Sequence, residues 1–141
     1  MIKIIYWTQT GNTEDMAKAI CEGVTQAGGD AQVLNVSQVK AEDLKDEAVF
    51  ALGCPAMGAE ELEESEMEPF VTELEQFVKG KTVGLFGSYG WGDGEWMRNF
   101  SERMQQAGAT VIDGEGLICQ GGPDEEDTKK CVELGKKLAK A

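Results

Sequence analysis

The chain has 141 residues, 41% of them hydrophobic, which fits one domain with a sizeable core and includes no apolar run long enough to span a membrane. Its 26 acidic and 13 basic residues give a net charge of −13, which disfavours binding to nucleic acid or anionic lipid. Histidine is absent, which excludes Ser-His-Asp and Cys-His catalysis and removes the commonest metal ligand.

The first half of the chain alternates between strand-like and helix-like patterns. Residues 2–7, 31–36 and 49–53 are short apolar runs that predict three strands. The third of these is almost continuously apolar, as in a strand that is covered on both faces. Apolar residues at helical spacing from Met16 to Ala27 predict a helix after the first strand, and residues 41–45 predict a helical turn.

The second half of the chain continues this alternation. Residues 54–68 fit neither period and predict a loop, while residues 70–78 predict a helix that Gly80 ends. Four further elements are expected: a strand at 82–88, a helix at 96–104 with Trp96 in the core, a fifth strand at 110–112 and 117–119 that is interrupted in between, and a final helix opened by Asp124. The four cysteines form no C-x-x-C pair, and we expect them to be buried and free.

Repeated β-α alternation predicts an α/β fold: a doubly wound, five-stranded parallel sheet with helices on both faces, in one domain over residues 1–141. In such sheets ligands bind at the carboxyl ends of the strands, where the strand order reverses. The loops after the first, third and fourth strands are therefore the places to search for a site.

The loop after the first strand, residues 8–13, reads Thr-Gln-Thr-Gly-Asn-Thr and leads into a helix. Its hydroxyls, amide and glycine predict an anion site made of neutral donors and the helix dipole. It is neither a Walker A loop nor G-x-G-x-x-G, and its lack of Lys and Arg favours a single terminal phosphate group. The alternative is a set of helix-capping residues, although one cap needs only one such side chain.

The loop after the fourth strand, residues 88–94, carries three glycines around Trp91. An indole in a glycine-rich loop predicts stacking on a planar ring system, and the alternative is that Trp91 covers the top of the core. In the loop after the third strand, Met57 is a candidate for the second face of the ring, or else packs within its own loop. The peptide between Gly58 and Ala59 can flip, because glycine tolerates either sign of φ.

Together the three loops resemble those of the flavodoxins, in particular the short-chain type of anaerobic bacteria, and the resemblance covers the whole chain. The motifs that carry it are Thr8-x-Thr10-Gly11-Asn12-Thr13, Cys54-Pro55-Ala56-Met57-Gly58 and Ser88-Tyr89-Gly90-Trp91-Gly92. The resemblance implies the strand order 2-1-3-4-5 and non-covalently bound FMN.

The resemblance also implies a role for each loop residue. The phosphate would be held by Thr8, Gln9, Thr10, Gly11, Asn12 and Thr13. The N5 and N3 edges of the ring would be lined by Met57, Gly58, Ala59 and Glu60, with Glu60 as the partner of N3–H. Tyr89, Gly90 and Trp91 would stack on the ring, and Pro55, Ala56 and Ser88 would flank the ribityl chain. Gly121 and Gly122 stand where polar side chains would be expected.

The function implied is that of a low-potential one-electron carrier rather than an enzyme, shuttling FMN between semiquinone and hydroquinone and substituting for ferredoxin. We expect a cytoplasmic monomer that binds redox enzymes through their basic docking patches, with no metal, nucleic acid or membrane partner. Six glutamates between residues 60 and 68 would disfavour added negative charge near the ring, or simply form a solvated face. The alternatives are an NAD(P)H-dependent flavin or quinone reductase and a cofactor-free receiver module on the same fold.

Overall fold

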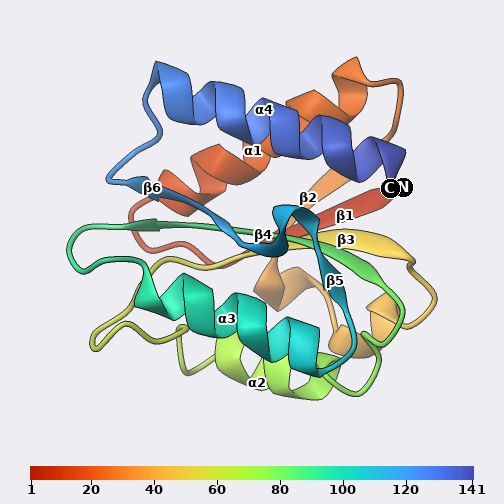
Figure 1. Ribbon diagram of the computed structural model, residues 1–141, viewed down its shortest axis with the longest axis horizontal. Helices are drawn as coiled ribbons and strands as arrows, with labels where there is room; N and C mark the ends of the chain where they lie inside the picture. Colours follow the sequence, from red (N-terminus) through yellow and green to blue (C-terminus); the bar gives the residue numbers. More distant parts are fainter.

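A parallel β-sheet lies at the centre of the computed structural model, which describes residues 1–141 (Figure 1). Its strands follow the order β2-β1-β3-β4-β5, with β6 also paired to β4, and every pair is parallel. This confirms the predicted sheet and its order. The strands are β1 (Ile2–Tyr6), β2 (Ala31–Asn35), β3 (Val49–Gly53), β4 (Thr82–Tyr89), β5 (Thr110–Val111) and β6 (Leu117–Gln120).

The fifth strand position is divided into β5 and β6, as the sequence predicts. Thr110 pairs with Thr82 near the start of β4, and Leu117 pairs with Phe86 further along it. Between them the chain leaves the sheet in a 3-10 turn, η3 (Ile112–Gly114), in which Asp113 has a φ of 64°. The two short strands therefore share one edge of β4.

Helices cover both faces of the sheet (Figure 1). Helices α1 (Asn12–Gln26) and α4 (Glu125–Lys140) pack on one face, and α2 (Met67–Leu74) and α3 (Glu95–Gln106) lie on the other. Two short 3-10 turns, η1 (Val36–Gln38) and η2 (Ala41–Leu44), connect β2 to β3. None of the helices combines the length and apolar composition needed to cross a membrane.

Helix α2 differs from its prediction at both ends. It begins at Met67, inside the predicted loop, because the Glu63 carboxylate accepts the Met67 N–H at 2.9 Å. It ends at Leu74, and Phe77 continues into a turn in which its N–H donates to the Leu74 carbonyl at 2.8 Å. Val78 is nevertheless fully buried, so its apolar character marks the core and not a continuing helix.

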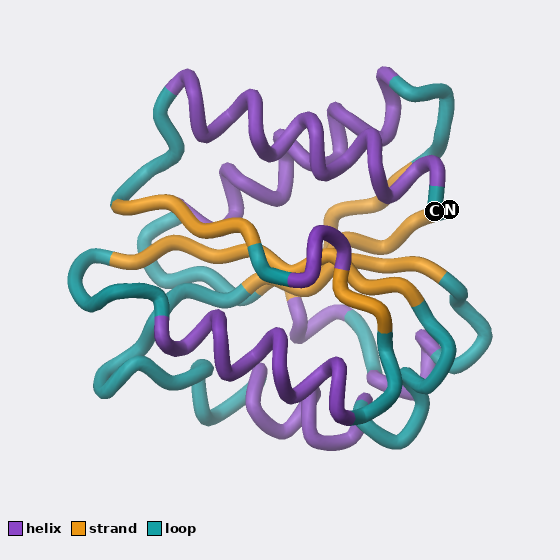
Figure 2. Tube along the Cα trace, in the orientation of Figure 1, coloured by secondary structure: helices purple, strands orange, loops and turns teal.

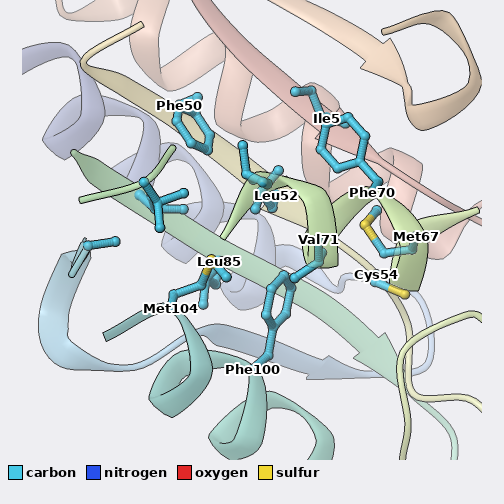
Figure 3. Close-up of a cluster of buried hydrophobic side chains, with 14 of the residues drawn as sticks. Ile5, Phe50, Leu52, Cys54, Met67, Phe70, Val71, Leu85, Phe100 and Met104 are labelled. Carbon is cyan, nitrogen blue, oxygen red and sulfur yellow. The ribbon is translucent and has the colours of Figure 1, made fainter. Parts of the chain in front are cut away.

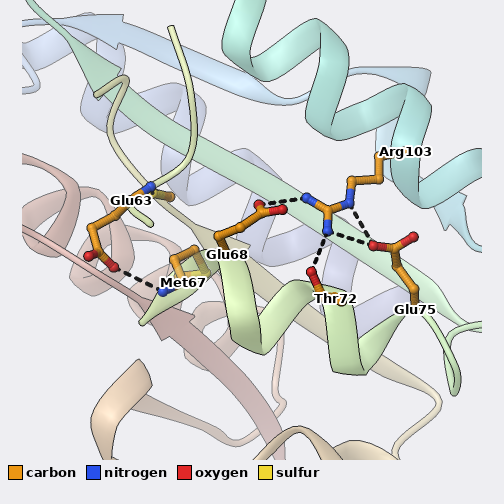
Figure 4. Close-up of polar contacts among 7 residues, drawn as sticks. Glu63, Met67, Glu68, Thr72, Glu75 and Arg103 are labelled. Atoms are coloured by element: carbon orange, nitrogen blue, oxygen red, sulfur yellow. Dashed lines mark hydrogen bonds and ion pairs between the residues drawn. The ribbon is translucent and has the colours of Figure 1, made fainter. Parts of the chain in front are cut away.

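Two apolar clusters fill the space between the layers, one on each face of the sheet. The larger cluster lies against α2 and α3 and includes Phe50, Leu85 and Phe100 (Figure 3). Trp96 belongs to it and is 1% exposed, as predicted. Arg103 of α3 joins the same two helices at their surface, through Glu68 and Glu75 of the α2 region (Figure 4).

All four cysteines are free; Cys21 is half-buried and the other three are buried. Burial raises the pKa of the Cys54 and Cys131 thiols to about 12 and that of Cys119 to about 11, so these thiols stay protonated. This confirms burial for three of the four cysteines and leaves no reactive thiolate in the core.

Candidate functional site

The loops that follow β1, β3 and β4 meet at the carboxyl ends of the strands, and the two chain termini lie at the opposite end of the sheet (Figure 2). They enclose a cleft of about 200 Å³. Three loops that are distant in sequence therefore converge, as expected for the carboxyl edge of a doubly wound sheet. The cleft is lined by Thr8, Gln9, Thr10, Asn12, Pro55, Ala56, Met57, Ser88, Tyr89, Gly90 and Gly121.

The loop after β1 turns into α1 at Gly11, which caps the helix with a φ of 96°. The Gly11 N–H donates to the Thr8 hydroxyl at 3.0 Å, so Thr8 fixes the turn. No side chain caps α1, and the N–H groups of its first turn have no partner within the helix. The helix terminus thus keeps the donors and partial positive charge that bind anions, which disfavours the capping alternative.

The loop after β3 forms a small hairpin. Met57 and Glu61 exchange both backbone hydrogen bonds at 3.0 Å, which leaves a three-residue tip between them. Gly58 has a φ of 44° and Glu60 a φ of 56°, so two of the three tip residues occupy the left-handed region. This hairpin lies within the stretch predicted as an irregular loop.

The Glu60 side chain lies against Gly92 of the loop after β4 and does not line the cleft. One of its carboxylate oxygens, Oε1, is buried and has no hydrogen-bond partner. Buried carboxylate oxygens are normally hydrogen-bonded, so this atom needs a donor that the chain does not supply. The side-chain oxygens of Glu60, Asp93 and Glu95 lie within 4.8 Å of one another, which concentrates negative charge beside the hairpin.

The loop after β4 contains Gly92 and Gly94, both with a φ of 91°. Its Trp91 side chain is 68% exposed, so Trp91 does not cover the core and the alternative role is wrong. Its predicted contact with a planar ring stays a prediction. The other indole of this region, Trp96, donates its Nε1–H to the Cys54 carbonyl at 2.9 Å and supports the hairpin loop from below.

Ten of the predicted residues line the cleft and six do not. Thr13 is fully buried, because its hydroxyl pairs with the Ser88 hydroxyl at 3.0 Å. Gly58 and Ala59 lie at the hairpin tip, beyond the lining, and Gly11 contributes only its backbone to the turn. Glu60 lies against Gly92, and Trp91 is largely exposed and is not among the lining residues.

One lining residue, Gly121, was not among the predicted site residues. It follows β6, and its N–H donates to the Tyr89 carbonyl at 2.8 Å, which brings a fourth loop to the cleft. Its neighbour Gly122 lies next to the Asn12 side chain. Its position at the carboxyl end of the fifth strand is the sequence feature that could have predicted this role. Its side chain gives no indication, because this loop contributes backbone atoms and not polar side chains to the cleft.

Three larger hollows lie elsewhere on the molecule. One, of about 390 Å³, separates β6 from α4, a second, of about 400 Å³, lies between the glutamate-rich segment and α3, and a third, of about 350 Å³, lies between the η1–η2 connection and α2. None of them gathers the three loops that follow β1, β3 and β4. The smaller cleft therefore remains the candidate site, because chemistry and topology favour it over volume.

Comparison with known proteins agrees with this geometry. The flavodoxin family model matches residues 4–135. A flavodoxin of Clostridium beijerinckii is 51% identical over 138 residues, covering 98% of this chain and 99% of that protein, and a flavodoxin of Megasphaera elsdenii is 48% identical over the full length of both. The solution structure of the two-electron reduced Megasphaera elsdenii flavodoxin superimposes with a TM-score of 0.88 and covers both chains completely.

These similarities extend over the whole fold and the three loops, and they favour electron transfer over the reductase alternative. The receiver alternative requires acidic residues after the first strand, where this chain has Thr8 and Gln9. The chain belongs to the flavodoxin family, whose members bind FMN and transfer electrons without being enzymes.

Proposed function

We propose that this protein is a low-potential one-electron carrier that holds FMN in the cleft at the ends of β1, β3 and β4. The observation that carries the proposal is the uncapped N-terminus of α1, which opens into the same cleft as the two loops beside it. A phosphate at that terminus would leave the flavin ring between the hairpin of Met57 and the loop of Trp91.

The residues present fit FMN. The phosphate loop offers neutral donors and no Lys or Arg, which suits one terminal phosphate held by hydrogen bonds. The Oε1 of Glu60 lies beside Gly92 without a hydrogen-bond partner, and after a turn of this side chain toward the cleft the N3–H of a flavin would supply the missing donor. Thr8, Thr10 and Asn12 would hold the phosphate, and Pro55, Ala56 and Ser88 would flank the ribityl chain.

When bound, FMN supplies the uptake and release of electrons, and the protein supplies binding and electrostatics. The peptide between Gly58 and Ala59 can present either its carbonyl or its N–H. In the loaded protein its carbonyl would accept a hydrogen bond from a protonated N5, and its N–H would donate one to an unprotonated N5. The carboxylates of Glu60, Asp93 and Glu95 disfavour added negative charge, which lowers the potential of the second electron.

We further propose that the protein acts in the cytoplasm as a one-domain monomer that takes the place of ferredoxin. Its net charge of −13 supports encounter with redox enzymes that carry basic patches beside their own cofactors. The exposed Trp91 and the hairpin tip lie at the edge where such a partner would come nearest to the flavin.

Purification followed by redox titration tests this proposal. We expect a yellow protein that releases FMN in equal amount to the chain and accepts two electrons in separate steps, the second at low potential. A colourless protein without affinity for FMN would contradict the proposal. Steady oxidation of NAD(P)H by the purified protein would replace it with the reductase alternative.

A further inference from the structure

The loop that follows β3 is closed at its base by Glu63. The Glu63 N–H donates to the Cys54 sulfur at 3.4 Å, so the loop ends where it began. Cys54 is itself held in place, because its N–H donates to the Phe86 carbonyl at 3.1 Å and its carbonyl accepts the Trp96 indole N–H at 2.9 Å. The loop base is therefore anchored to β4 and α3.

The Glu63 carboxylate fixes the other side of this base. Oε1 accepts the Ser65 N–H at 2.7 Å and also the Ser65 hydroxyl. Oε2 accepts the Glu66 N–H at 2.8 Å and the Met67 N–H at 2.9 Å, and Figure 4 shows the contact with Met67. Glu63 is 5% exposed and forms no ion pair with Lys or Arg. One buried carboxylate thus uses all its acceptors on α2 and the turn before it.

These hydrogen bonds keep Glu63 ionised. Burial raises the pKa of this carboxyl, but the hydrogen bonds from Ser65, Met67 and Glu66 outweigh burial, and the pKa lies below its ordinary value. The loop tip is different in kind, since Gly58 and Glu60 lie in the left-handed region with no comparable anchor. The base of the loop is therefore held by the Glu63 carboxylate and by Cys54, while the tip is closed only by the two backbone hydrogen bonds between Met57 and Glu61.

We propose that Glu63 is a positioning residue for electron transfer, which clamps the base of the hairpin so that the Gly58–Ala59 peptide meets reduced FMN from a fixed position. This inference rests on the proposed FMN site. Glu63 does not line the cleft and acts through the hairpin. With the base already ordered by folding, less conformational entropy is lost when the tip hydrogen-bonds to the reduced flavin, so the reduced state is bound more tightly.

The test compares Glu63→Gln with Glu64→Gln in the full-length, FMN-loaded protein. Both remove one negative charge from the same segment, but Glu64 is exposed and makes no hydrogen bond through its side chain. Removing charge alone raises the flavin potentials, because added electrons are repelled less. Loss of the hydrogen bonds to the Glu63 carboxylate lowers the flavin potentials instead, because it weakens binding of the reduced form. The sign of the change in potential therefore separates the two effects.

We expect Glu63→Gln to weaken the binding of reduced FMN relative to oxidised FMN by about threefold to tenfold, part of the effect of losing a hydrogen bond to a charged group. The first one-electron potential should fall accordingly. Amide hydrogen exchange at Met57 and Glu61 should become faster in the loaded protein. Glu64→Gln should leave this exchange unchanged and raise the potentials slightly.

Ser65→Ala provides a second variant that leaves the net charge unaltered. It removes the hydroxyl donor to Oε1, and we expect a smaller shift in the same direction as Glu63→Gln. The proposal is overturned if Glu63→Gln raises the potentials as Glu64→Gln does. It is also overturned if Glu63→Gln and Ser65→Ala lower stability but leave the ratio of the affinities for reduced and oxidised FMN unchanged. If Glu63→Gln does not fold, the ratio of the affinities for reduced and oxidised FMN is measured in Ser65→Ala, and an unchanged ratio overturns the proposal. Failure of the FMN site itself would appear in the wild-type protein, as absent FMN binding.

Discussion

The buried hydroxyl of Thr13 joins two of the three loops that line the cleft. It pairs with the Ser88 hydroxyl at 3.0 Å and accepts the Ser88 N–H at 3.4 Å, although the two residues are 75 positions apart. Through this contact the first turn of α1 is tied to the end of β4. Thr13 therefore shapes the proposed phosphate site without presenting its side chain to the cleft.

Replacing Thr13 with valine keeps the shape of the side chain and removes its hydroxyl. We expect the free energy of unfolding to fall by about 1–3 kcal/mol, because the buried polar atoms of Ser88 lose a partner. Urea unfolding monitored by circular dichroism measures the change. Thr25→Val is the matched control on the exposed face of α1, with an expected change within about 0.5 kcal/mol. Equal losses in the two variants would show that the buried pair contributes nothing.

Glu63 should make stability depend on pH. Its pKa in the folded protein is lowered from the ordinary 4.5, because hydrogen bonds outweigh burial, so it stabilises the fold above that pH. This contribution is lost as the pH falls through the lower folded value. We expect the difference in unfolding free energy between wild type and Glu63→Gln to be larger at about pH 7 than at about pH 3. A difference that is constant over this range would contradict an ionised Glu63.

At the scale of elements, the strands follow closely from the sequence and α2 does not. Strand β3 is an apolar run that is covered on both faces, so its composition alone predicts its burial. The start of α2 depends on hydrogen bonds that the Glu63 carboxylate accepts from the backbone N–H groups of Glu66 and Met67, and such contacts leave no periodic pattern in the sequence. In the site, the sequence predicts which loops converge but not side-chain direction, because the position of the Glu60 side chain against Gly92 depends on the packing of two loops that are distant in sequence.

The N-terminus of α1 should distinguish FMN from riboflavin, which lacks the phosphate. Thr10 lines the cleft beside this terminus, and Thr10→Ala would remove one donor to the phosphate. We expect FMN affinity to fall about 10- to 100-fold, as for one hydrogen bond to a charged group, with little change for riboflavin. Quenching of flavin fluorescence on titration with the FMN-free protein measures both affinities. Thr10→Ser retains the hydroxyl and is the control, and an equal loss for both flavins would place the phosphate elsewhere.

At the scale of the whole molecule, the cleft is lined by loops at the carboxyl ends of the strands. The chain termini lie at the opposite end of the sheet (Figure 1). The carboxylates of Glu60, Asp93 and Glu95 place part of the net charge of −13 beside the cleft, where Arg98 pairs with Asp93 at 3.1 Å. Near the chain termini, Lys137 of α4 pairs with Asp113 at 2.8 Å. The negative charge that a partner meets first thus depends on its direction of approach.

Electron transfer to a basic redox protein should therefore depend on where charge is removed and not only on how much. The double variant Glu61→Gln/Glu64→Gln neutralises two exposed carboxylates beside the hairpin, and Asp30→Asn/Asp46→Asn neutralises two exposed ones near the amino ends of β2 and β3. For wild type we expect the second-order rate constant to fall as ionic strength rises, because salt screens the attraction. Stopped-flow measurement at several salt concentrations should give a shallower dependence and a slower low-salt rate for the hairpin variant than for its equally charged control. Identical behaviour of the two variants would mean that net charge alone steers the encounter, and a rate independent of salt in the wild type would exclude electrostatic docking at this edge.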